Sequence, residues 1–160
     1  MTDDCVFCRI IRKQESAAIV HEDGQIVAFM DIRPVRRGQV LVIPKRHVDH
    51  FVDLPDDLAT AVFLAGQQLA RVIRAVLAPR RVGMIVHGFG VAHAHLVILP
   101  LEHAWDITAA QFAVIENGSV MFRWESVPVA PREDLDAMAD MLRRELTSAP
   151  SALPAPAHHR

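Results

Sequence analysis

The segment at residues 54–77 constrains the fold of this chain more than any other feature. Its apolar residues recur at the spacing of one helical face, at positions 58, 62, 65, 69, 72, 73 and 76. A stripe of this kind has to be buried against other secondary structure. Asp53, Asp56 and Asp57 supply the capping chemistry and the first-turn charge of a helix start. We therefore expect one long helix that covers a sheet.

Short segments rich in Val, Ile and Phe lie on both sides of this helix in the sequence. Three precede it and two follow it, at residues 17–23, 25–32, 39–44, 81–88 and 91–100. Gly, Pro and Asp-Gly punctuate them, and connections this tight favour antiparallel pairing. The sequence therefore predicts an α+β fold, in which a five-stranded antiparallel sheet carries the long helix and a C-terminal helix.

Helices are also predicted at both ends of this body, over residues 5–13 and 131–146. The stretch at residues 108–128 fits two structures, a hairpin around Asn117-Gly118 or a helix that this pair caps. We expect residues 1–146 to form a single domain, followed by a flexible Pro/Ala-rich tail over residues 147–160.

Composition and charge narrow the possible functions. With 51% hydrophobic and 22% charged residues, the chain can bury a core and is not disordered. No apolar run approaches the roughly 20 residues that span a bilayer, and the acidic start lacks the basic region of a secretory signal, so we expect a cytoplasmic protein without a membrane partner. A net charge of −2 supplies no global field for polymeric nucleic acid. A nucleic-acid role would need a local basic site, and a single nucleotide is the simpler partner.

The two histidines of the segment at residues 91–100 are the first candidates for chemistry. On a strand, residues i and i+2 share a face, so we expect His93, His95 and Val97 to line one side of the sheet, about 7 Å apart in turn. Two imidazoles at one site can serve as nucleophile, base or metal ligand. The alternative is a pair of half-exposed histidines that bond to backbone or water.

The two cysteines, Cys5 and Cys8, form a Cys-x-x-Cys pair at the start of the first predicted helix. In a reducing compartment they are packed thiols, a redox pair or half of a metal site. A redox pair lacks the thioredoxin-like βαβ context. Two imidazoles would complete a tetrahedral zinc site, and His47, His50 and His93 are the candidates.

The order of these motifs resembles the histidine triad superfamily of nucleotide hydrolases and transferases. The likeness covers residues 5–100, from CVFCRII through AFMDIRP, VLVIPKRHV and the long helix to HAHLVILP. The family signature is His-x-His-x-His, two apolar residues and often Pro. Aligned on the final Pro100, its three histidine positions fall on His93, His95 and Val97; the other register, with His93 in the middle, leaves Pro100 two residues too far along.

The resemblance implies an enzyme that works at the α-phosphate of a nucleotide or nucleotide conjugate. His95 would attack phosphorus and form a nucleotidyl-imidazole, with the adjacent signature histidine, His93, beside it. It also implies a homodimer and a structural zinc. The zinc ligands carried over from the family are Cys5, Cys8, His47 and His93, which leaves His50 spare.

The resemblance further implies a nucleotide pocket. Asp31 would bond the ribose hydroxyls, with Phe29 and Ile32 beside the base. His87 occupies a position where relatives often carry Asn and could supply a donor. Val97 replaces the third signature histidine and removes a donor from the phosphate. The alternative function is therefore a nucleotide-binding, zinc-stabilised protein with little or no turnover.

Overall fold

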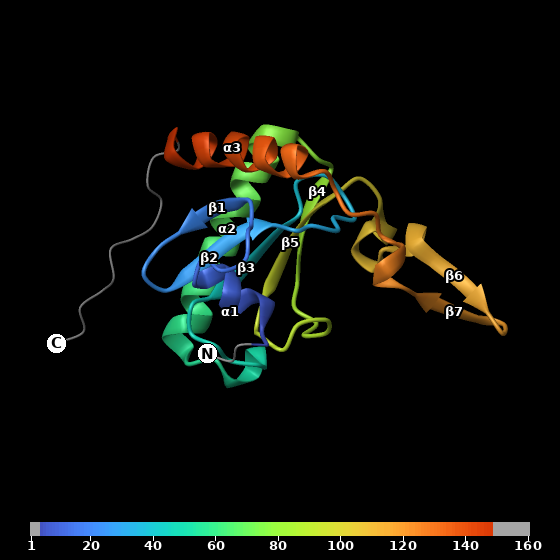
Figure 1. Cartoon of the computed structure of the whole chain (residues 1–160). Helices are drawn as coiled ribbons and strands as arrows, with labels where there is room; N and C mark the ends of the chain where they lie inside the picture. The colour runs from blue at the N-terminus through green and yellow to red at the C-terminus, as the bar shows by residue number, and fades with distance from the viewer. Residues whose placement is uncertain (1–3, 149–160) are drawn as a thin grey trace.

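Five strands form one antiparallel sheet at the centre of the computed structural model, which describes residues 4–148 (Figure 1). The strands lie in the order β1-β2-β3-β5-β4, and all neighbouring pairs are antiparallel. They are β1 (Ile19–Glu22), β2 (Ile26–Met30), β3 (Val40–Pro44), β4 (Arg81–Ile85) and β5 (Leu96–Leu101). The prediction of an α+β fold with a five-stranded antiparallel sheet is confirmed.

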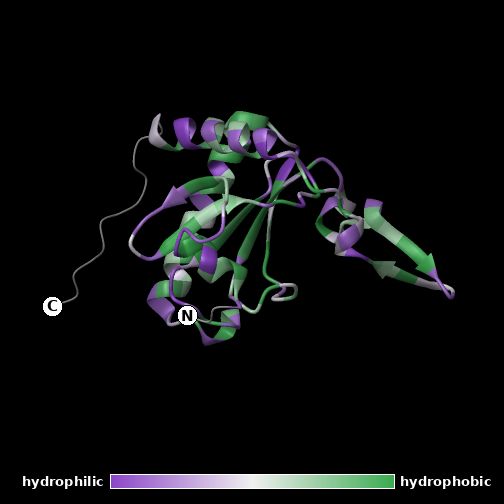
Figure 2. Cartoon of the chain, in the orientation of Figure 1, coloured by the Kyte–Doolittle hydropathy of each residue, from purple (hydrophilic) through white to green (hydrophobic). Residues whose placement is uncertain are grey.

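Helices cover both faces of this sheet. On one face lie α2 (Asp56–Leu77) and α3 (Arg132–Ser148), and their apolar sides meet alternate strand residues in the main core, such as Ala28 and Val42. The predicted stripe of α2 lies in this core or at its margin. In Figure 2 the strands of the central sheet are largely hydrophobic, and α3 alternates between hydrophilic and hydrophobic residues along its length. On the other face the short α1 (Val6–Ile11) packs against the opposite strand residues.

The long helix begins later than the sequence predicted. Phe51–Asp53 form a separate 3-10 turn, and α2 starts at Asp56 with Pro55 at the capping position. The predicted cap by Asp53 is therefore wrong, since the helix start has no side-chain hydrogen bond. Proline suits the edge of a helix because its missing N–H would have no partner there.

Three small or apolar residues of α2, Ala65, Gly66 and Leu69, would permit close approach of a second helix in a dimer, but they are used inside the protomer instead. A side chain on Gly66 would come 2.5 Å from a methyl group of Leu96 in β5, so glycine allows the helix to lie close to the sheet. Leu69 is buried in the main core, and Ala65 packs against the same core. These residues give no support for a dimer.

The last strand also differs from its prediction. β5 begins at Leu96, whereas residues 91–95 form a loop. Two backbone hydrogen bonds hold this loop. The His93 N–H donates to the Val91 carbonyl within the loop, and the Ala94 N–H donates to the carbonyl of Val48, after β3, at 2.7 Å. The expectation that two histidines share one strand face is therefore wrong.

Residues 113–122 form a second, two-stranded sheet that projects from the body (Figure 1). Its strands are β6 (Ala113–Glu116) and β7 (Ser119–Phe122), joined by Asn117 and Gly118, both with positive φ. Of the two structures that the sequence left open, the hairpin is the one formed. Many of its apolar side chains are exposed, among them Ile115, Val120 and Phe122.

The C-terminal helix α3 continues to Ser148, two residues into the range expected for the tail, and residues 149–160 of that tail lie outside the described part. Between residues 4 and 148, no helix is both long and apolar enough to span a bilayer.

Candidate functional site

Four candidate metal ligands from three parts of the chain meet at one end of the central strands β3 and β5. Cys5 and Cys8 come from α1 and the residue before it, His47 from the loop after β3, and His93 from the loop before β5. Their ligand atoms all lie within 4.8 Å of one another. His50, the spare imidazole, is exposed beside Asp49 and takes no part.

The distances within this cluster test whether it fits a metal. The Nδ1 atoms of His47 and His93 are 3.3 Å apart, and the Cys8 sulfur lies 3.3 Å from His47 Nδ1 and 3.8 Å from His93 Nδ1. Nitrogen ligands about 2.0–2.1 Å from a tetrahedral zinc stand about 3.3–3.4 Å apart, and sulfur ligands slightly farther. Two thiols and two imidazoles at these separations therefore suit a closed, structural zinc.

The tautomer of His93 fits the same role. Its Nε2 lies 2.9 Å from the Pro44 carbonyl, which can only accept, so Nε2 carries the proton. Nδ1 is left with a lone pair that faces the cysteines. Burial also lowers the pKa of His93, which favours the neutral, metal-binding form.

His95 lies in a different environment from His93, although only one residue separates them. Its side chain lines a cavity of about 180 Å³ that His93 does not reach, and the Phe7 ring makes edge contacts with both imidazoles. His95 Nδ1 donates to the His93 carbonyl at 2.7 Å. That bond fixes the ring and leaves Nε2 with its lone pair free for chemistry.

The structure therefore divides the two signature histidines between two sites. The side chain of His93 belongs to the metal cluster, and its backbone carbonyl orients His95. Val97, two residues further on in β5, lines the same cavity as His95 with a side chain that offers no donor.

Asp31 is the predicted ribose ligand and does line the cavity, at the end of β2. Its carboxylate accepts from the Arg33 N–H at 2.8 Å and from the Gln39 side-chain amide at 2.6 Å. Burial raises the pKa of Asp31, although these two bonds oppose the rise. Gln39, a buried lining residue that sequence reasoning missed, also accepts from the Val35 N–H and so ties the loop after β2 together.

Two other predicted pocket residues do not reach the cavity in this structure. Phe29 is 3% exposed and packs edge-on against Phe7 in the core beneath α1. Ile32 lies on the surface and is 57% exposed. His87, by contrast, does line the cavity, and its ring meets that of His95 at 5.8 Å between centroids. Burial lowers the pKa of His87, with the neighbouring His95 adding to the effect.

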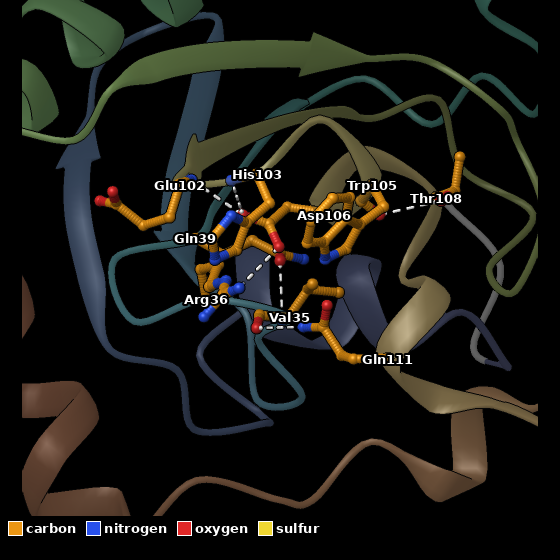
Figure 3. A network of polar contacts seen from close by, with 9 residues as sticks. All are labelled: Val35, Arg36, Gln39, Glu102, His103, Trp105, Asp106, Thr108 and Gln111. Atoms are coloured by element: carbon orange, nitrogen blue, oxygen red, sulfur yellow. Dashed lines mark hydrogen bonds and ion pairs between the residues drawn. The ribbon is translucent and has the colours of Figure 1, made fainter.

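A buried carboxylate that the sequence did not single out closes the cavity on its far side. Asp106 is fully buried and accepts from the Arg36 guanidinium at 2.7 Å and from the backbone N–H groups of Glu102 and His103, as Figure 3 shows. Burial alone would raise its pKa, but these hydrogen bonds outweigh burial and hold the pKa at about 2. The charged carboxylate thus joins the loop after β2 to the segment after β5. The only sequence signal is its position three residues after His103, which matches a capping box.

Comparison with known proteins decides the family. The family model of the HIT domain matches residues 12–104, more than half of the chain. The chain belongs to the histidine triad superfamily. This HIT chain is 36% identical over 103 residues to the protein named hit of Bacillus subtilis, covering 61% of this chain and 71% of that protein.

Solved HIT structures share its fold. A zinc-bound histidine triad family protein from Mycobacterium smegmatis is 26% identical, with a TM-score of 0.68 over 90% of this chain and 94% of that one. A Hit-like protein from Bartonella henselae is 23% identical and has a TM-score of 0.70 over 91% of this chain and 98% of that one. The second likeness concerns the fold alone.

Proposed function

We propose that this HIT protein is a nucleotide hydrolase or nucleotidyl transferase that uses His95 as its nucleophile. The observation that carries the proposal is the bond from His95 Nδ1 to the His93 carbonyl, which leaves an unprotonated Nε2 on a cavity-lining ring. A neutral imidazole held in one tautomer is a competent nucleophile near pH 7.

The reaction proceeds in two displacements. His95 Nε2 attacks the α-phosphorus, the N–P bond forms as the bond to the leaving group breaks, and the leaving group departs with the bonding pair and is protonated. A water molecule or a second acceptor then attacks phosphorus and breaks the N–P bond. The nucleoside monophosphate or its conjugate leaves, and His95 returns to its neutral state.

The groups around the cavity support a nucleotide as substrate. Asp31 keeps acceptor capacity for sugar hydroxyls because each carboxylate oxygen has two lone pairs and only one bond. Leu41, Ile85 and Leu99 offer apolar walls for a base. No Lys or Arg is among the residues that line the cavity, so phosphate charge would rely on backbone N–H groups of the loop at residues 88–92 and on His87.

The direct test is intact-protein mass spectrometry after mixing with a panel of nucleoside phosphoramidates and dinucleotides. We expect a mass increase of one nucleoside monophosphate on the protein, located on His95. If no member of the panel gives an adduct or is hydrolysed, the alternative function holds, which is a zinc-stabilised nucleotide-binding HIT protein with little turnover. The lack of a donor on Val97 favours this alternative.

Replacing Val97 with histidine is expected to raise turnover. Val97 lines the cavity with His95, so an imidazole there would place a donor beside the phosphate where negative charge develops. One such donor is typically worth about 10²–10³ in kcat, and the effect should fall on kcat more than on KM. The measurement is steady-state hydrolysis of the substrate found above. Val97→Ile, which keeps a buried apolar side chain, is the matched control. If Val97→His has the same kcat as the wild type, the low turnover is caused by the loop at residues 88–92 and not by Val97.

We propose that zinc is held by Cys5, Cys8, His47 and His93 and acts as a structural cofactor. The support is the donor geometry described above, together with the zinc-bound relative from Mycobacterium smegmatis. A Cys-x-x-Cys pair that meets two imidazoles suits metal binding in a reducing compartment, and we therefore propose a cytoplasmic location.

We further propose that the protein is a homodimer, for which the exposed hairpin β6–β7 is the strongest support. A lone two-stranded hairpin is marginally stable, and Ile115, Val120 and Phe122 are each at least 50% exposed, so a second copy of the chain would stabilise the hairpin by covering them.

Light scattering should give twice the chain mass of 17.8 kDa. Ile115→Asp combined with Phe122→Asp should return the mass to that of one chain, while Val52→Asp, at an exposed site on another part of the surface, should leave the dimer intact. A monomeric wild type contradicts the proposal.

A further inference from the structure

Four arginines gather outside the candidate catalytic cavity, at the end of α2 and the start of β4. They are Arg71, Arg74, Arg80 and Arg81, and all are exposed. Within residues 4–148, none of the four has a carboxylate within ion-pair distance. The chain as a whole carries a formal charge of −2, so these four arginines form a locally positive patch on an otherwise slightly negative protein.

The surface beneath these arginines is hollowed. One hollow is lined by Arg71, Arg74, Arg80 and Arg81 with Gln67 and Pro79, and a second one shares Arg80 and Arg81 with the segment at residues 101–105. The sheet explains why these distant segments meet, because Arg81 at the start of β4 pairs with Leu101 at the end of β5 (Figure 1). The two hollows therefore share Arg80 and Arg81 as a common border, and we call the four arginines the arginine strip.

Two aromatic rings stand at the end of the strip. His103 and Trp105 are stacked, with centroids 4.7 Å apart and an interplanar angle of 10°. Trp105 is 53% exposed, so a large part of this indole is open to solvent. Glu102 is the one carboxylate that lines the second hollow.

Hydrogen bonds to the backbone of residues 102–105 fix the aromatic pair. The buried Asp106 accepts from the backbone N–H groups of Glu102 and His103 and is itself anchored by Arg36, as Figure 3 shows. The hydroxyl of Thr108 adds a bond to the Trp105 carbonyl at 2.8 Å. A platform fixed in this way loses little conformational freedom when a planar ligand stacks on it.

From this juxtaposition we propose a second binding site, for single-stranded nucleic acid, formed by the arginine strip and the His103–Trp105 platform. A base stacks on the exposed face of Trp105, and successive phosphates lie along Arg81, Arg80 and Arg74. Basic grooves that end on aromatic rings bind single strands in this manner, with little sequence preference. The site lies outside the candidate cavity and does not depend on chemistry at His95. It also revises the expectation that polymeric nucleic acid is no partner, because the chain does carry a local basic site.

The test is fluorescence anisotropy of a labelled single-stranded thymidylate dodecamer, titrated with the full-length protein at low and moderate salt. We expect saturable binding that weakens with salt. Each phosphate contact contributes about −0.7 to the slope of log K against log salt, so Arg80→Glu combined with Arg81→Glu should reduce the slope by about 1.4. Trp105→Ala should weaken binding about 5- to 150-fold through loss of one stacked base.

Arg144→Glu is the matched charge control, because Arg144 is an exposed arginine of α3 outside both hollows. Thermal unfolding of each variant shows that it is folded. Retained binding in Arg144→Glu, with loss in the double variant and in Trp105→Ala, supports the site. Absence of binding by the wild type, or equal loss in Arg144→Glu, overturns it. Full binding by Trp105→Ala, together with equal competition by inorganic polyphosphate, also overturns it, since the strip would then be a general anion patch.

Discussion

Replacing His95 with alanine is expected to abolish the covalent nucleotidyl adduct and to lower hydrolysis by at least about a thousandfold, the scale seen when a nucleophile is removed and binding is left intact. His95 combines two properties in the cavity. Its ring is 6% exposed and fixed by a 2.7 Å bond to a backbone carbonyl, and the bond leaves Nε2 free. Alanine removes that nitrogen without adding bulk.

Two further variants decide whether the effect belongs to His95 alone. His50→Ala removes an exposed imidazole outside the cavity and should leave both adduct and rate unchanged. His87→Ala removes the other imidazole of the cavity and should slow the reaction while the adduct still forms on His95. An adduct that persists in His95→Ala, or one that maps to His87 in the wild type, would show that the mechanism is assigned to the wrong residue.

The sheet and the helices were predictable because each has a strong local signal. The stripe of α2 has helical spacing over its whole length, and the strands are β-branched runs between turn residues. The errors lie at boundaries. The segment with both histidines has the alternating pattern of a strand, yet residues 91–95 leave the sheet because their backbone bonds locally and to Val48. Tertiary contacts of this kind leave no periodic trace in a sequence.

The site was predictable to a different extent in each of its parts. The Cys-x-x-Cys pair indicated half of a metal site, the family resemblance supplied His47 and His93, and all four residues do meet. The pocket was harder. Phe29 and Ile32 stand beside Asp31 in sequence, but one side chain enters the core and the other faces solvent. Gln39 was missed because a single Gln in a loop has no distinguishing pattern, and Asp106 was missed because its one signal, the capping-box spacing from His103, is weak.

His93 links the two parts of the site through one residue. Its side chain belongs to the metal cluster, and its backbone carbonyl accepts the proton of His95 Nδ1. Phe7, between the two cysteines, contacts both imidazole rings. A change at the metal cluster is therefore expected to move the group that orients the proposed nucleophile.

This linkage leads to the second large effect, which concerns removal of the metal cluster. We expect protein purified without chelator to contain about one zinc per chain, since closed tetrahedral sites of two thiolates and two imidazoles hold zinc tightly. Cys8→Ala should lose the zinc. Cys8 is fully buried at the junction of α1, the loop after β3 and the loop before β5. Without the metal, the Nδ1 atoms of His47 and His93 would lie 3.3 Å apart with no cation to hold them together.

The loss of stability should be large, because metal binding to a structural site contributes to the free energy of folding and whole domains are stable by only about 5–15 kcal/mol. The main core between α2, α3 and the sheet does not include the cluster, so we expect Cys8→Ala to fold but to unfold at a much lower temperature. Elemental analysis and calorimetry measure both quantities, and His50→Ala should match the wild type in each. Below its unfolding temperature, Cys8→Ala should also form the His95 adduct more slowly, since the His93 carbonyl is no longer held in place. A wild-type content under roughly 0.2 zinc per chain, or an unchanged unfolding temperature in Cys8→Ala, would mean that the four side chains pack together without a metal.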